Sequence, residues 1–192
     1  MALDSEISRI ALLVTQTLEN YGIRYAVGGS LASSLHGVMR STLDVDIVAD
    51  LLPEHIPLLV AALSEQFYAD GEMMRNAIER EGSFNLIHYD TAFKVDIFIS
   101  KGRPFSRTQL ERRELTAITA DPDRTIYITT PEDTILAKLE WYRLGGEASD
   151  RQWRDILGVL KTRAGDLDLG YMRRWAAELE VEDLLERALR EA

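Results

Sequence analysis

The stretch VGGSLASSLHGVMRSTLDVDIV, residues 27–48, contains the features that decide the fold. The turn Gly28-Gly29-Ser30 directly follows residues 24–27, whose apolar side chains predict a short buried strand. Residues 31–36 have the pattern of a helix that starts at this turn. Residues 43–49 are β-branched and apolar around two aspartates, which predicts a second strand. A strand, a glycine turn, a helix and another strand in close succession indicate a fold that mixes helices and sheet.

Two carboxylates lie in the second of these strands. Side chains alternate between the faces of a strand, so Asp44 and Asp46 point the same way, while Val45 and Ile47 point into the core. Two neighbouring carboxylates repel each other, and burying them is costly unless a cation lies between them. Mg²⁺ suits this role because it prefers oxygen ligands and leaves room for substrate phosphates, with Mn²⁺ as its substitute. The competing interpretation is a solvated pair at an exposed strand end.

A third carboxylate, Asp96, lies in the middle of KVDIFI, residues 94–99, inside a predicted strand over residues 92–99. If this strand neighbours the one over residues 43–49, its carboxylate joins the other two at a shared metal site. Two metal ions bound there would clamp both the attacking and the leaving oxygen of a phosphoryl displacement.

The turn Gly28-Gly29-Ser30 is suited to binding phosphate. Glycines allow positive φ and let the backbone approach a ligand closely, and free N–H groups at a helix start attract anions. The Ser30 hydroxyl can donate a further hydrogen bond. The turn lacks the lysine of the Walker A motif and the third glycine of the dinucleotide motif. An ordinary tight turn with a serine cap is the alternative, but the short helix before Asp44 can bring the turn back beside the strand.

The rest of the chain predicts an α+β fold with a helical end. Further helices are expected over residues 4–21, 53–67 and 72–80, and further strands over residues 84–88 and 125–128. The sequence Thr130-Pro131-Glu132-Asp133 is typical of a helix start, and more helices follow over residues 151–161, 169–179 and 181–190. We therefore divide the chain into an α/β core, residues 1–129, and a helical segment, residues 130–192, which we expect to pack on the core.

Composition limits the partners. The chain of 192 residues has 22 lysines and arginines against 32 aspartates and glutamates, a net charge of −10, which disfavours non-specific nucleic-acid binding. It has no cysteine, so disulfides, thiolate zinc sites and cysteine nucleophiles are excluded. No apolar run is long enough to span a bilayer, and we expect a cytoplasmic protein. One basic cluster is either a solvated face or a contact for RNA or a triphosphate; it comprises Lys101, Arg103, Arg107, Arg112 and Arg113.

Taken together, Gly28-Gly29-Ser30, Asp44-Val45-Asp46 and Asp96 resemble the pattern of the nucleotidyltransferase superfamily, which has a DNA polymerase beta-like fold. That pattern is Gly-Gly or Gly-Ser, a helix, D-x-D and a third acid on a later strand. Residues 27–48 look like the small bacterial branch that includes minimal nucleotidyltransferases and the abortive-infection and toxin–antitoxin enzymes. The resemblance implies a mixed sheet flanked by helices, with a C-terminal helical segment packed on it.

The resemblance also implies roles for individual residues. The glycines and serine of the turn would hold the triphosphate, the first two aspartates would bind Mg²⁺, and Asp96 would complete the site and help deprotonate the acceptor hydroxyl. Arg40 and Thr42 match a basic and hydroxyl pair that often precedes D-x-D in this branch. Lys138 and Arg154 would reach the nucleotide phosphates from the helical segment. Without the resemblance, Lys138 reads as a surface lysine in an ion pair, and Arg154-Asp155 as a salt bridge between helices or a cap.

The expected function is Mg²⁺-dependent transfer of a nucleoside monophosphate from a nucleoside triphosphate to a hydroxyl group. The acceptor could be RNA such as tRNA, a protein or a small molecule, and the enzyme could be a toxin–antitoxin component with a cognate partner protein. The alternative is a catalytically inactive module of the same fold that binds nucleotide or a partner protein.

Overall fold

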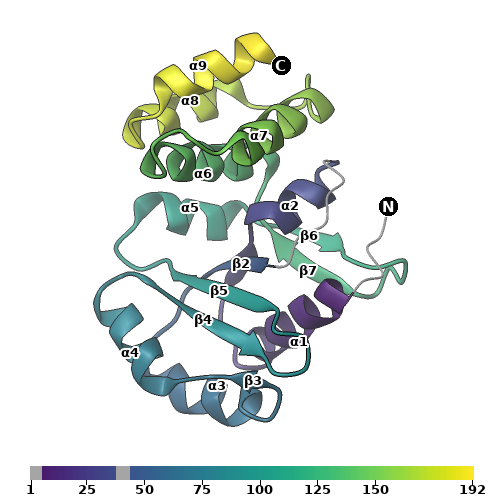
Figure 1. Cartoon of the computed structure of the whole chain (residues 1–192), viewed down its shortest axis with the longest axis vertical. Coiled ribbons are helices and arrows are strands. Elements are labelled where there is room, and N and C mark those ends of the chain that lie inside the picture. Colours follow the sequence, from purple (N-terminus) through teal and green to yellow (C-terminus); the bar gives the residue numbers. More distant parts are fainter. Residues whose placement is uncertain (1–5, 38–43) are drawn as a thin grey trace. The chain divides into compact units, whose positions relative to one another are not determined.

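The computed structural model describes residues 6–37 and 44–192 and confirms the predicted α+β fold (Figure 1). The described residues divide into two compact units. Residues 6–31 and 44–129 form the sheet unit, and residues 32–37 and 130–192 form the helical unit. The segment that follows Leu31 is thus grouped with the helical unit, although it precedes the second strand in the sequence.

Within the described part of the chain, the sheet unit contains one seven-stranded mixed sheet, with the order β3-β4-β5-β2-β1-β7-β6 (Figure 1). Strand β2 pairs with β5 in parallel, as does β1 with β7, and the other neighbours are antiparallel. The two strands predicted to carry the acids are therefore direct neighbours. The strands are β1 (Tyr25–Val27), β2 (Asp44–Ala49), β3 (Phe67–Tyr68), β4 (Ser83–His88), β5 (Lys94–Ile99), β6 (Glu114–Ala117) and β7 (Thr125–Ile128).

Strands β2 and β5 have one fully apolar face. Every second residue on each strand is buried, and these residues are Val45, Ile47, Ala49, Val95, Ile97 and Ile99. The alternate residues are half-buried or exposed. This alternation anchors both strands in the core and leaves their other face available to polar side chains.

Helices pack on this sheet and against one another. Helix α1 (Glu6–Asn20) buries Ile10, Val14 and Leu18 and packs on β2 and α3 (Ile56–Leu63). Helix α3 in turn packs on α4 (Gly71–Glu79), and α5 (Pro104–Arg112) packs on β1 and β2.

The helical unit contains α6 (Pro131–Leu144), α7 (Asp150–Thr162), α8 (Leu169–Glu178) and α9 (Glu182–Glu191), close to the ranges predicted from sequence. Helix α6 begins at the predicted cap, where the Thr130 hydroxyl accepts a hydrogen bond from the Asp133 N–H at 3.2 Å. The rings of Tyr142 on α6 and Trp153 on α7 pack with their centroids 5.2 Å apart. Helix α2 (Gly29–Leu35) contributes its second half to this unit.

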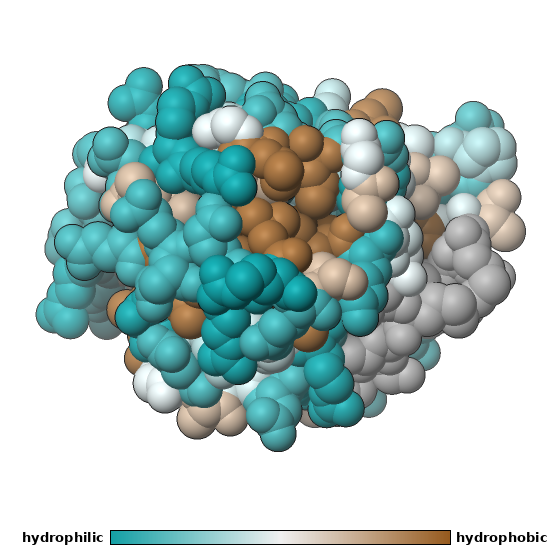
Figure 2. Space-filling model, turned by 90° about the horizontal axis from the view of Figure 1, so that it is seen from above, coloured by the Kyte–Doolittle hydropathy of each residue, from teal (hydrophilic) through white to brown (hydrophobic). Residues whose placement is uncertain are grey.

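Some apolar side chains of the helical unit remain exposed, among them Trp141, Leu144 and Leu169. Figure 2 shows an apolar area surrounded by hydrophilic residues on the face that it views. Among the described residues, each helix is too short or too polar to traverse a bilayer.

Two sequence predictions differ from the structure, and two further elements were not predicted. The helix expected over residues 53–67 is a 3-10 turn, η1 (Pro53–His55), followed by α3, and Phe67 instead pairs with His88 at the start of a strand. The strand expected from residue 92 begins at Lys94. Helix α5 and strand β6 were not predicted, because α5 is largely polar and the side chains of β6 are mostly exposed.

A buried tyrosine joins three elements of the sheet unit. The Tyr25 hydroxyl donates a hydrogen bond to Glu19 at 2.5 Å and accepts one from the Tyr127 N–H at 3.3 Å. Burial, and secondarily the hydrogen bond to Glu19, raises the pKa of Tyr25 above its ordinary value. The phenol is therefore protonated at all physiological pH values and serves as a fixed donor.

We predict that Tyr25→Phe lowers the free energy of unfolding by about 1–2 kcal/mol, because the Tyr127 N–H loses its acceptor and Glu19 loses a donor. Urea denaturation measures this change. The control is Tyr89→Phe, at an exposed side chain, which should leave the stability unchanged. Equal stability of Tyr25→Phe and the wild type would contradict a structural role for this hydroxyl.

Candidate functional site

The parallel pairing of β2 and β5 brings the predicted acids together. In this register Asp46 lies opposite Asp96, and Asp44 lies opposite Lys94. Paired residues on neighbouring strands point to the same face, so the two opposed carboxylates share the face that is not apolar. Asp44, two residues before Asp46, lies on that face as well. All three acids singled out in the sequence therefore converge on one side of the sheet unit.

These carboxylates differ in burial. Asp44 is exposed, Asp46 is half-buried, and the Asp96 side chain is 21% exposed. The site is thus partly withdrawn from water but remains open on the side of Asp44. Charges in such a place interact more strongly than on an open surface, because water screens them less.

Lys94 is a fourth residue of this site, which sequence reasoning missed. Its ammonium lies 2.8 Å from Asp96 Oδ2. The pKa of Lys94 is raised, chiefly by the hydrogen bond to Asp96 and further by the negative charges of Asp96, Asp44 and Asp46. The ammonium therefore lies in the field of all three carboxylates. The signal in the sequence was its position two residues before Asp96, which places both on one face of the strand.

The glycine turn contacts the same site. The Gly28 N–H donates a hydrogen bond of 2.8 Å to the Asp46 carbonyl, which ties the turn to β2. Gly29 has φ +57°, and a Cβ added there would lie 1.8 Å from Asp46 Oδ2. Only glycine accommodates both the left-handed backbone and this close approach. Ser30 follows in the first turn of α2 and is half-buried.

The donor chemistry of the site fits a hard divalent cation, since all three acids supply carboxylate oxygens from adjacent strands. The space cleared by the missing Cβ of Gly29 lets the Asp46 carboxylate sit at the turn that was predicted to hold phosphates. As the side chains stand, however, no group of three or more His, Asp or Glu among the described residues is arranged to hold a metal ion. The Lys94 ammonium already supplies a positive charge to this cluster.

Two predicted nucleotide-binding residues lie in the helical unit. Lys138 is buried and its ammonium lies 2.9 Å from Asp155 Oδ2, so α6 and α7 are joined by an ion pair. This pair is buried, whereas the interpretation without the resemblance had placed Lys138 at the surface. Arg154 is exposed and donates from Nε to the Asp150 carbonyl. Arg40 and Thr42 lie outside the described residues. A contact of these four side chains with nucleotide stays a prediction.

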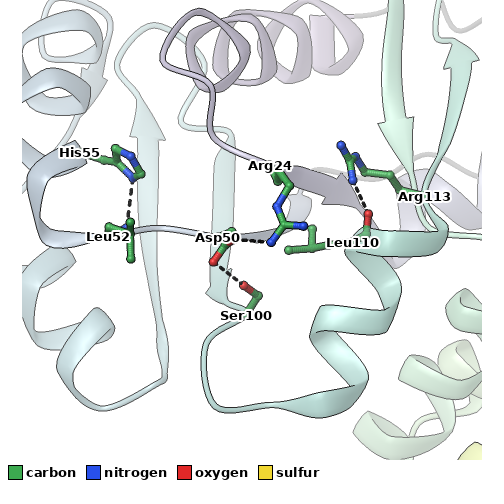
Figure 3. Close-up of polar contacts among 7 residues, drawn as sticks. All are labelled: Arg24, Asp50, Leu52, His55, Ser100, Leu110 and Arg113. Carbon is green, nitrogen blue, oxygen red and sulfur yellow. Dashed lines mark hydrogen bonds and ion pairs between the residues drawn. The ribbon is translucent and has the colours of Figure 1, made fainter.

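One further carboxylate near the same strands has a structural partner. Asp50 follows β2 and accepts hydrogen bonds from Arg24 at 2.6 Å and from the Ser100 hydroxyl at 3.4 Å (Figure 3). Arg24 balances the charge of Asp50, which lies at the opposite end of β2 from Asp44. Asp50 therefore offers a matched control for substitutions in the acidic cluster.

The basic cluster around α5 is partly structural too. The Arg113 guanidinium lies over the Tyr127 ring, 4.5 Å from its centroid, and donates to the Leu110 carbonyl (Figure 3). Lys101 and Arg107 are exposed.

Comparison with known proteins identifies the fold. No protein-family model matches the chain, and no curated protein matches it in sequence. In structure it is similar to an antigenic nucleotidyltransferase-like protein from Paracoccidioides brasiliensis, with 17% identity and a TM-score of 0.59 over 99% of this chain and 94% of that one.

Two further solved structures are similar. One is ANT(2″)-Ia in complex with adenylyl-2″-tobramycin, with 11% identity and a TM-score of 0.53 over 92% of this chain and 98% of that one. The other is the lincosamide antibiotic adenylyltransferase LnuA with lincomycin bound, with 17% identity and a TM-score of 0.50 over 81% and 96%. At these identities the likeness establishes the fold alone. The chain has a nucleotidyltransferase-like fold, as its motifs predicted.

We predict that Gly29→Ala lowers the free energy of unfolding by about 1–2 kcal/mol or more, because alanine is strained at this φ and its Cβ would collide with the Asp46 carboxylate. Gly28→Ala is the control, since a Cβ there would lie 3.9 Å from the nearest atoms of Thr129. Chemical denaturation of both variants measures the difference. Equal stability of the two variants would show that the carboxylate does not approach the turn as described.

Proposed function

We propose that the protein is a nucleotidyltransferase that transfers a nucleoside monophosphate from a nucleoside triphosphate to a hydroxyl acceptor, with Mg²⁺ or Mn²⁺ held by Asp44, Asp46 and Asp96. The observation that carries this proposal is the pairing of Asp46 with Asp96 across β2 and β5, directly beside the Gly28-Gly29 turn. Acids on two strands beside a glycine turn are also what the resemblance to nucleotidyltransferases requires. The fold of the chain is consistent with it.

In the proposed reaction the acceptor oxygen forms a bond to the α-phosphorus, and the bond from that phosphorus to the departing pyrophosphate breaks. Asp96, whose side chain is only 21% exposed, accepts the proton of the acceptor hydroxyl. The backbone of Gly28 and Gly29 lies close to Asp46 and orients the triphosphate beside it. A bound divalent cation supplies neutralisation of the phosphate charge.

The net charge of −10 favours an acceptor that is not a long nucleic acid. Two structures of similar fold hold lincomycin and adenylyl-2″-tobramycin, so small molecules can be accommodated on this fold. We therefore propose a small-molecule or protein hydroxyl as the acceptor ahead of RNA.

A second candidate function is favoured by one observation. The ion pair between Lys94 and Asp96 reduces the negative charge of the site without any metal, as a non-catalytic module would need. Such a module would bind nucleotide or a partner protein, as in a toxin–antitoxin pair, and would not transfer nucleotide. Loss of transfer activity on removal of a site carboxylate separates the two functions.

We predict that Asp46→Asn lowers nucleotide transfer by about 100-fold or more, because the carboxylate next to the triphosphate turn is lost. The assay incubates the protein with each α-³²P-labelled nucleoside triphosphate, Mg²⁺ and a panel of aminoglycosides, lincosamides, proteins and tRNA. Asp50→Asn is the matched control, since its carboxylate faces Arg24 and Ser100, and it should retain activity.

The melting temperatures of both variants should be measured in the assay buffer, so that a loss of activity can be told apart from a loss of folded protein. Absence of labelled product with all four nucleotides would contradict the proposed reaction and favour the non-catalytic module. Equal activity of Asp46→Asn and the wild type would contradict the role of Asp46 in the proposed reaction.

A further inference from the structure

We propose that Lys94 is an internal counter-ion of the acidic site. Its ammonium forms an ion pair with the Asp96 carboxylate when no divalent cation is bound, and this ion pair must break for the cation to bind. The inference rests on the proposed metal role of Asp44, Asp46 and Asp96. It assigns to Lys94 control of how tightly the site holds its metal.

The geometry places the ammonium where a cation is needed. Lys94 lies opposite Asp44 in the parallel register and two residues before Asp96 on the same face of β5. Its Nζ atom is 2.8 Å from Asp96 Oδ2. The three carboxylates lie on this face, so the ammonium reduces the repulsion between Asp96 and its neighbours.

The same Asp96 oxygen cannot serve both cations at once. A Mg²⁺ ion binds carboxylate oxygens at about 2.0–2.1 Å, and an ammonium that stayed at Asp96 Oδ2 would then lie within a few ångströms of a double positive charge. At such separations like charges repel strongly in a partly enclosed site. Binding of a metal ion to Asp96 Oδ2 therefore requires the ammonium to move away.

A second lysine–aspartate ion pair, between Lys138 and Asp155, is buried and serves as a comparison. Lys138 and Asp155 have side chains only 8% and 5% exposed, so neither can leave without uncovering a buried charge. Lys94 is 42% exposed and Asp96 is 21% exposed. The Lys94 side chain can thus swing into water at low cost, which an exchangeable counter-ion must do.

The test compares Lys94→Gln with wild type and with Lys161→Gln, which removes the same charge from an exposed position on α7. Binding of Mn²⁺ is measured from the electron paramagnetic resonance signal of the free ion. We expect Lys94→Gln to bind Mn²⁺ roughly threefold to tenfold more tightly than wild type, because no ammonium competes for Asp96. Lys161→Gln should bind like the wild type.

Thermal unfolding provides the second readout. In EDTA, Lys94→Gln should melt at a lower temperature than the wild type, since Asp96 loses its ion pair with Lys94, and saturating Mn²⁺ should remove this difference. Equal or weaker Mn²⁺ binding by Lys94→Gln, with wild-type binding that is lost in Asp46→Asn, would overturn the inference and leave the proposed function intact. Absence of Mn²⁺ binding in the wild type and in Lys94→Gln would overturn the proposed function, and the inference with it.

Discussion

The structure of the site depends on one constraint, the close approach of the Asp46 carboxylate to the backbone of Gly29. A side chain at position 29 would occupy the place of this carboxylate. The hydrogen bond from the Gly28 N–H to the Asp46 carbonyl holds the backbone of the turn next to the backbone of β2. The turn and β2 are therefore held as one piece. Because β2 also pairs with β5 in register, Asp96 and Lys94 are placed relative to the same turn.

This arrangement concentrates negative charge at the edge of an apolar core. The buried residues of β2 and β5 hold both strands in place, so the carboxylates on the other face cannot move apart by shifting the backbone. Their repulsion must be balanced by a cation. Lys94 provides one positive charge within the chain, and a divalent metal would provide two, which makes the state of the site sensitive to its ionic surroundings.

Much of this architecture could be predicted from the sequence. The alternation of apolar residues with Asp44, Asp46 and Asp96 indicated two strands with their acids on one face, and the glycine turn indicated a close backbone approach. The sequence could not show that the strands pair in register, since pairing depends on contacts far apart in the chain. The spacing of Lys94 and Asp96 on one strand was visible in the sequence, but only the register shows that Lys94 also lies opposite Asp44. Lys138 illustrates the same limit, because its partner Asp155 lies on another helix.

Diffraction can test directly whether the carboxylates of β2 and β5 share a divalent cation. Crystals grown with Mn²⁺ and a non-hydrolysable nucleoside triphosphate would locate the metal by its anomalous scattering. We expect an anomalous peak within coordination distance of both Asp46 and Asp96, with the Lys94 ammonium displaced. A peak bound to other residues, or none at saturating Mn²⁺ with the ammonium still at Asp96, would contradict the account.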